Sequence, residues 1–187
     1  MTPAGFWRRS AAWMLDFMAI MAVVVLLVWP RLLAGLQSAS AAMKQLSERT
    51  ADAMFDAMMQ GSPLPGMVPQ LLRDPRLLES AEALHSALWH AFAPLLLGYA
   101  LLALAIHVGG ELSPWQGSPG KRLLGIKVTD MHGARLSWPR VLLRHAAGLL
   151  SWLTLNLGHA MAAMPPDKRA LHDIAAGARV ARRDPAG

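Results

Sequence analysis

The chain has 187 residues, of which 54% are hydrophobic and 16% are charged, and its formal net charge is +6. The charged fraction is below the roughly 25% that is typical of soluble domains, so the composition fits a small polytopic membrane protein. No cysteine is present, which excludes disulfides, thiolate catalysis and cysteine-ligated metal sites. Basic chains also bind nucleic acid, but no basic face with interleaved aromatic residues is present, so we expect no nucleic-acid partner.

The first apolar segment runs from about residue 10 to residue 30. It is long enough to cross a bilayer, for which about 20 helical residues suffice. Tryptophans lie near both of its ends, as is typical of membrane interfaces, and Pro30 can kink or end the helix. Asp16 lies inside the segment, where a carboxylate is costly unless it is paired, neutralised or hydrated. Arg9 precedes it by two helical turns on the same face, so we expect a polar site in the cytoplasmic half of the membrane.

Residues 31–83 follow as amphipathic helical sequence, with apolar residues at near-helical spacing among charged ones. The sequence Gly61-Ser-Pro-Leu-Pro-Gly66 predicts a break. Asp74 and Pro75 then predict the N-cap and the first residue of a new helix, which continues into a second span at about residues 87 to 108. Because acidic and basic residues nearly balance in residues 31–83, the positive-inside rule places this segment outside the cytoplasm.

Residues 109–140 carry more lysine and arginine than acidic residues, and the same rule places them in the cytoplasm together with the N-terminus. Ser118 and Pro119 predict an N-cap and a first helical turn. The β-prone runs 123–129 and 134–138 flank the turn sequence Asp130-Met-His-Gly133. This arrangement predicts a β-hairpin within the cytoplasmic loop.

A third apolar segment, residues 141–164, contains Arg144 and ends at two consecutive prolines. One full crossing would place the basic tail, residues 165–187, outside the cytoplasm, against the positive-inside rule. We therefore favour a broken or re-entrant segment that returns the tail to the cytoplasm over a plain third span. Non-helical backbone at that depth must be buried in protein or line a wet cavity.

Three blocks, one near each end of the chain and one in its middle, carry a family resemblance. They are Gly5-Phe-Trp-Arg-Arg-Ser-Ala-Ala-Trp-Met-Leu-Asp16, Ser118–Asp130 continued by Leu142-Leu-Arg144, and Lys168-Arg-Ala-Leu-His-Asp-Ile-Ala-Ala-Gly177. In this order they resemble the RDD family of small membrane proteins, named for one arginine and two aspartates. By position these three resemble Arg9, Asp16 and Asp173. The resemblance implies a membrane location, and transport of small solutes or ions has been suggested for the family. Residues 31–83 match none of the blocks and look like an insertion.

The charged residues allow two interpretations each. Asp16 either binds a proton or cation, or forms an ion pair with Arg9 or Arg144 that fixes helix packing; we favour the ion pair. Asp173 either bonds to backbone N–H groups as a capping or loop carboxylate, or is a second partner for the arginines.

We expect residues 1–187 to form one all-α integral membrane domain with two transmembrane helices, a third polar-bearing apolar segment and a small cytoplasmic β-hairpin. It would lie in a bacterial inner membrane with both termini cytoplasmic. Potential metal ligands occur only as pairs such as His107 and Glu111, and no catalytic or cofactor motif appears, so we expect no enzyme, metal or cofactor.

The leading function is transport of a small ion or solute, or assistance to it, at a site of Arg9, Asp16, Arg144 and Asp173. The alternative is an assembly or accessory module in which these charges are structural. In that case the extramembrane helices would bind a protein partner or a second copy of the chain.

Overall fold

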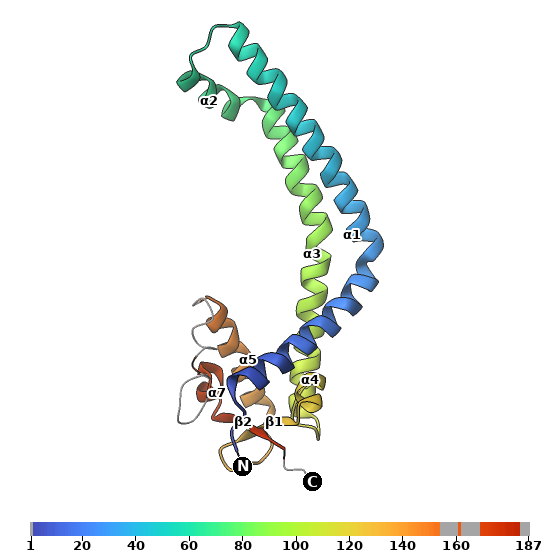
Figure 1. The fold of residues 1–187 in the computed structure, drawn as a ribbon, viewed down its shortest axis with the longest axis vertical. Coiled ribbons are helices and arrows are strands. Elements are labelled where there is room, and N and C mark those ends of the chain that lie inside the picture. The colour runs from blue at the N-terminus through green and yellow to red at the C-terminus, as the bar shows by residue number, and fades with distance from the viewer. Residues whose placement is uncertain (1, 154–160, 162–168, 184–187) are drawn as a thin grey trace. The chain divides into compact units, whose positions relative to one another are not determined.

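The computed structural model describes residues 2–153, 161 and 169–183. The elements in chain order are α1 (Phe6–Met59), α2 (Leu64–Arg73), α3 (Pro75–Leu112), α4 (Pro119–Leu123), β1 (Ile126–Asp130), α5 (Trp138–Leu153), α7 (Leu171–Ala175) and β2 (Ala178–Arg182) (Figure 1). The chain divides into two compact units. We call them the sheet unit, Met1–Ala22 with Tyr99–Gly187, and the hairpin unit, Val23–Gly98. Both long helices, α1 and α3, contribute residues to each unit.

Two helices, α1 and α3, are long and apolar enough to cross a membrane, and this matches the two predicted spans. They have 54 and 38 residues, whereas a bilayer needs only about 20, so each helix continues beyond its apolar part. Pro30 lies inside α1 and does not end it. The predicted start of α3 is confirmed, because Asp74 Oδ1 accepts the backbone N–H of Arg76 at 2.8 Å.

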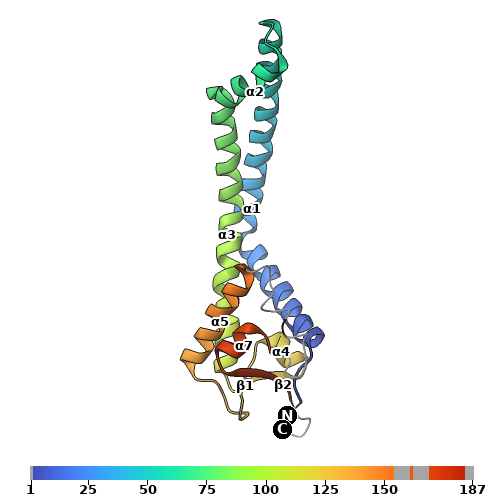
Figure 2. The same ribbon diagram turned by 90° about the vertical axis from the view of Figure 1, so that its left-hand side faces the viewer.

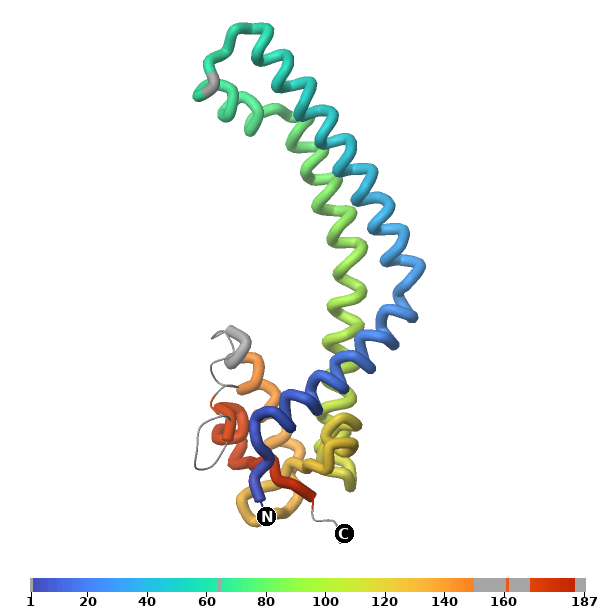
Figure 3. Tube along the Cα trace, in the orientation of Figure 1, coloured from blue at the N-terminus to red at the C-terminus, as the bar shows by residue number. Residues whose placement is uncertain are grey.

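Within the hairpin unit, α1 and α3 run antiparallel and side by side (Figure 3). A Cβ on Gly35 would lie 2.6 Å from the Cβ of Ala91, so the absence of a side chain lets the two helices touch. Further along, Arg49 Nη1 donates to Ser80 Oγ at 2.9 Å and to the backbone carbonyl of Arg76 at 3.0 Å. The unit is therefore a helical hairpin joined by close backbone packing and by one bridging arginine.

The two-stranded sheet of the sheet unit corrects the predicted hairpin. β1 pairs antiparallel with β2, in a register that runs from Ile126 opposite Arg182 to Asp130 opposite Ala178 (Figure 2). The turn after β1 does form, since the Asp130 carboxylate accepts the backbone N–H groups of His132 and Ala134, each at 2.8 Å. Residues 134–137 then form no strand, and β1 pairs with β2 instead. α5 begins directly after them at Trp138, and its second residue, Pro139, has the fixed backbone angle that suits the first turn of a helix.

The sheet gathers three distant parts of the chain. The backbone N–H of Ala4 donates to the carbonyl of Val180 at 2.9 Å, so the N-terminal residues lie beside β2. Ile126, Val128 and Val180 are buried against Val141 of α5 in one apolar core. This explains why the sequence blocks near both ends and in the middle occur together, since they build one small core.

The third apolar segment begins as the helix α5, which carries Arg144. Of the residues beyond Leu153, 154–160 and 162–168 lie outside the described part of the chain. The predicted choice between a re-entrant segment and a full crossing falls on those residues. The predicted basic tail, residues 165–187, supplies α7 and β2 from its described part.

Candidate functional site

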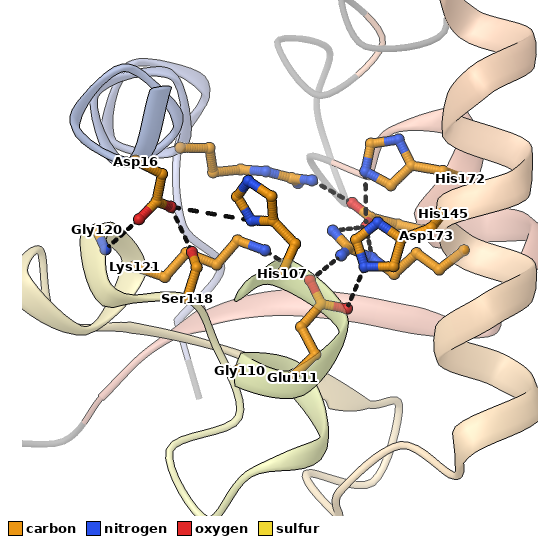
Figure 4. A network of polar contacts seen from close by, with 12 residues as sticks. Asp16, His107, Gly110, Glu111, Ser118, Gly120, Lys121, His145, His172 and Asp173 are labelled. Carbon is orange, nitrogen blue, oxygen red and sulfur yellow. Dashed lines mark hydrogen bonds and ion pairs between the residues drawn. The ribbon is translucent and has the colours of Figure 1, made fainter. Parts of the chain in front are cut away.

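Buried charged side chains of the sheet unit form one network (Figure 4). Its carboxylates are Asp16 on α1, Glu111 on α3 and Asp173 on α7. They are 4%, 1% and 0% exposed, respectively. A buried charge is costly unless it is paired and hydrogen-bonded, so the partners of each carboxylate indicate what it can do.

Asp173 has both of the roles that its sequence context left open, because it bonds to a backbone N–H group and pairs with the arginines. Its Oδ2 accepts the backbone N–H of Ala170 at 3.1 Å, at the start of α7. Its Oδ1 accepts Arg144 Nε at 2.9 Å, while Oδ2 also pairs with Arg9. Burial alone would raise the pKa of Asp173, but the guanidinium groups of Arg144 and Arg9 outweigh it and hold that pKa well below its usual range. Asp173 is therefore a fixed negative charge at neutral pH.

Glu111 is a central residue that the predicted set lacked. Its Oε1 accepts Lys121 Nζ at 2.6 Å and also Arg144, so Arg144 bridges Glu111 and Asp173. Burial lowers the pKa of Lys121, and the carboxylate of Glu111 opposes this effect. We call Arg9, Glu111, Lys121, Arg144 and Asp173 the arginine cluster.

Asp16 has partners of a different kind. The Ser118 hydroxyl donates to Oδ2, and the backbone N–H of Gly120 donates to Oδ1 at 2.7 Å. A Cβ on Gly120 would lie 2.9 Å from Asp16 Oδ1 and would also collide with the carbonyl oxygen of Ala12. Only glycine therefore lets the start of α4 approach α1 this closely.

The predicted ion pair of Asp16 with Arg9 or Arg144 is wrong. Both arginines bind Asp173, and Asp16 receives neutral hydrogen-bond donors from α4 instead. Ser118 does stand at the N-cap of α4 as predicted, but its hydroxyl makes no capping bond to that helix. The Ser118 oxygen thus accepts no backbone N–H of α4, and its hydroxyl donates to the carboxylate of Asp16 on α1 instead.

Two histidines lie near these carboxylates, His107 beside Asp16 and His145 beside Glu111 (Figure 4). His107 Nδ1 lies 4.0 Å from Asp16 Oδ2, and within the described residues no other lysine, arginine or histidine nitrogen comes within 4.0 Å of that carboxylate. The ring centroids of His107 and His145 are 6.3 Å apart, and His145 Nε2 lies 3.6 Å from Glu111 Oε2. We call Asp16, His107, Ser118 and Gly120 the Asp16 site.

The predicted set is thus divided between two places. Arg9, Arg144 and Asp173 come together, while Asp16 lies at the other end of the histidine pair. A sequence signal for Glu111 was available, because it follows the second apolar run and lies four residues after His107 on the same helix face. No group of three histidine, aspartate or glutamate side chains in the described ranges is arranged to hold a metal ion.

Most of the chain matches a known protein family. The model of the RDD family matches residues 3–177. A relative, "Uncharacterized protein YxaI" of Bacillus subtilis (strain 168), is 33% identical over 90 residues, which are 48% of this chain and 59% of that protein. The match thus covers less than two thirds of the relative's length. No solved structure matches the chain.

Proposed function

This chain belongs to the RDD family, and we propose that it moves a proton or another small cation at the Asp16 site, as a transporter or as part of one. The observation that supports this proposal is the charge pairing of Asp16. Its carboxylate is buried in α1, and the nearest cationic group among the described residues is a histidine that can gain or lose a proton.

The arginine cluster cannot vary its charge in the same way. Glu111 and Asp173 contact Lys121, Arg144 and Arg9, and an arginine stays protonated at any accessible pH. In contrast, the pair of Asp16 and His107 has a net charge of −1 when the imidazole is neutral. One proton or one monovalent cation makes the pair neutral, which removes the cost of a buried charge.

The surroundings of the Asp16 site suit reversible loading. Ser118 and Gly120 orient the carboxylate without neutralising it. The further ionisable groups of the described residues that interact with the pair are Lys121, His145 and Glu111 around His107 and the phenol of Tyr99 near Asp16. His145 continues the path from His107 toward Glu111, and at 6.3 Å between ring centroids a proton would cross that gap through a water molecule or a side-chain movement.

The location proposed for this activity is a bacterial inner membrane, with the N-terminus, residues 109–140 and the tail in the cytoplasm. The excess of lysine and arginine in these segments supports this orientation. Reporter fusions after residue 60 and after residue 183 should give opposite locations. A reporter after residue 183 found outside the cytoplasm would contradict the orientation of the tail.

The alternative function is that of an accessory module, and the hairpin unit supports it. Beyond its apolar part α1 exposes Met43, Met54, Phe55 and Met58, and flexible methionine side chains suit contact surfaces. In that case the arginine cluster and the Asp16 site hold the sheet unit together while the hairpin unit binds a protein partner or a second copy.

Flux in proteoliposomes tests the proposal against this alternative. Purified full-length protein is exposed to an imposed pH gradient with sodium, potassium or no cation inside, and internal pH is followed with a dye. We expect flux in the wild type, none in Asp16→Asn or His107→Gln, and part of it in Asp16→Glu, which keeps the charge. Asp52→Asn and His132→Gln, at exposed positions outside the network, are the matched controls.

Two results would favour the accessory module. One is a wild type that moves no cation. The other is a set of folded Asp16→Asn and His107→Gln proteins that retain the wild-type flux.

A further inference from the structure

The hairpin unit contains a groove, lined by five small or apolar residues and four polar ones, that the proposed function does not use. It has a volume of about 760 Å³ and lies between α1 and α3, which Figure 3 shows side by side. The lining residues are Arg31, Ala34, Gly35 and Ser38 of α1 and Ala83, Ser86, Ala87, His90 and Pro94 of α3. The volume falls in the range of about 300–1,000 Å³ that is common for small-molecule sites.

The ionisable side chains that line this groove are basic. Its lining has a guanidinium from Arg31, an imidazole from His90 and the hydroxyls of Ser38 and Ser86, while none of the lining residues, all in the described part of the chain, is acidic. Arg31 and His90 are exposed, and neither pairs with a carboxylate in the described ranges. Arginine donors bind phosphate oxygens, and Ser86 adds a hydroxyl, whereas the hydroxyl of Ser38 already donates to the backbone carbonyl of Ala34 at 3.0 Å. The groove therefore suits a phosphate-bearing anion.

The position of the groove indicates which kind of molecule carries that phosphate. Trp29 and Trp89 are 53% and 63% exposed and lie at the ends of the two apolar runs, where tryptophan marks the membrane interface. Arg31 and His90 neighbour these tryptophans in sequence. The groove is thus at the depth of lipid headgroups.

Apolar side chains continue from the groove toward the bilayer. Leu27 lies about one turn from Arg31, and Leu97 about two turns from His90, each near the groove-lining face of its helix. They are 75% and 62% exposed. A free phosphate ion would make no use of such side chains, whereas the acyl chains of a lipid would cover them.

We propose that this groove binds an anionic phospholipid, with the headgroup phosphate between Arg31 and His90 and the acyl chains along Leu27 and Leu97. The small residues Ala34, Gly35, Ala83 and Ala87 leave the space that the headgroup occupies. The lipid bridges α1 and α3 at the interface, next to the close contact of Gly35 and Ala91. This site does not depend on the Asp16 site or on any transport activity.

Native mass spectrometry of the full-length protein in detergent tests this site. The protein is mixed with equal amounts of phosphatidylglycerol and diacylglycerol of the same acyl length, because diacylglycerol lacks the phosphate. We expect the wild type to retain phosphatidylglycerol about tenfold more strongly, the size of one charge-assisted hydrogen bond. Arg31→Gln with His90→Gln should remove this preference, and Arg31→Lys should keep most of it. Arg73→Gln, an exposed arginine of the same unit that does not line the groove, is the control.

A second arm separates a lipid from a free anion. Inorganic phosphate and soluble glycerol phosphate are added as competitors, and at millimolar concentration we expect them to displace little phosphatidylglycerol. Displacement by either at concentrations similar to that of the lipid would overturn the lipid assignment. Equal retention of both lipids by the wild type, or an unchanged preference in the double variant, would also overturn it. If the double variant does not fold, loss of preference in His90→Gln alone is the required result.

Discussion

The arginine cluster and the Asp16 site lie in one unit but hold buried carboxylates in opposite ways. In the cluster, Glu111 and Asp173 face lysine and arginine. At the Asp16 site a hydroxyl and a backbone N–H orient the carboxylate, and a histidine is its nearest cationic group among the described residues. The first arrangement fixes charge, and the second allows it to change. The comparison separates residues that hold the fold from the residues at which we propose that a proton or cation binds.

Removal of Arg144 should break the arginine cluster most strongly. Arg144→Gln leaves Glu111 and Asp173 buried without their shared cation, and loss of one partner of a buried pair costs about 3–5 kcal/mol. We expect the free energy of unfolding, measured by chemical denaturation in detergent, to fall by that amount. Arg140→Gln, at an exposed position of the same helix, should change it by less than about 0.5 kcal/mol. A loss below about 1 kcal/mol for Arg144→Gln, as for a surface pair, would contradict the role of the cluster.

Substitution of Gly120 should disrupt the Asp16 site by a steric clash, without any change of charge. Gly120→Ala places a methyl group against Asp16 and the carbonyl of Ala12, and overpacking of this kind costs about 1–3 kcal/mol. The matched control is Gly148→Ala in α5, because a Cβ there meets no atom within 4 Å. That control should raise helix stability by about 0.5–1 kcal/mol. A Gly120→Ala protein as stable as the wild type would show that α4 does not pack as closely as described.

The same substitution of aspartate by asparagine, made once in each site, compares the two sites directly. Asp16→Asn keeps an acceptor for Gly120 and leaves no arginine unpaired, so we expect a loss of about 1 kcal/mol. Asp173→Asn removes the charge that compensates Arg9 and Arg144, so its loss should be about 3–5 kcal/mol. Parallel denaturation of the two variants measures the difference. Equal losses would mean that Asp16 is as firmly structural as Asp173.

A smaller effect should appear in the pH dependence of the stability that Asp173 contributes. Its folded pKa lies below the unfolded value of about 3.9. The stability that the ionised form contributes is therefore fully present above that value and is lost as the pH falls toward the folded pKa. Melting temperatures of the wild type and Asp173→Asn should converge as the pH is lowered from about 5 to about 3. A gap that stays constant over this range would show that Asp173 does not titrate as inferred.

Much of the fold could be predicted from local sequence. The length and hydropathy of the apolar runs predict α1 and α3, and Asp74 with Pro75 predicts where α3 begins. The sheet could not be predicted this way, because local pattern reports which segments are β-prone but not which partner each one finds. The strand partner of Val128 is Val180, 52 residues further along the chain, and it leaves no trace in the sequence near β1.

The site shows the same limit. Helical spacing placed Arg9 and Asp16 on one face, which favoured a pair between them. The structure separates them because Asp173 and Gly120 arrive from elsewhere in the chain and offer each residue a better partner. Partners that depend on tertiary contacts between distant segments are invisible to periodicity. Arg9 and Arg144 are identified from charge in or beside apolar sequence, and Asp173 is identified from the family resemblance.

The contact of Arg9 with Asp173 has a consequence for how this protein is made. The two residues are 164 positions apart, and a ribosome adds about 5–20 residues per second. Roughly 10 to 30 seconds therefore pass between the synthesis of the arginine and that of its partner. During that interval both apolar helices are already available to the insertion machinery, while β2 does not yet exist. The nascent chain must keep Arg9 hydrated at the membrane surface until its last segments emerge and close the cluster.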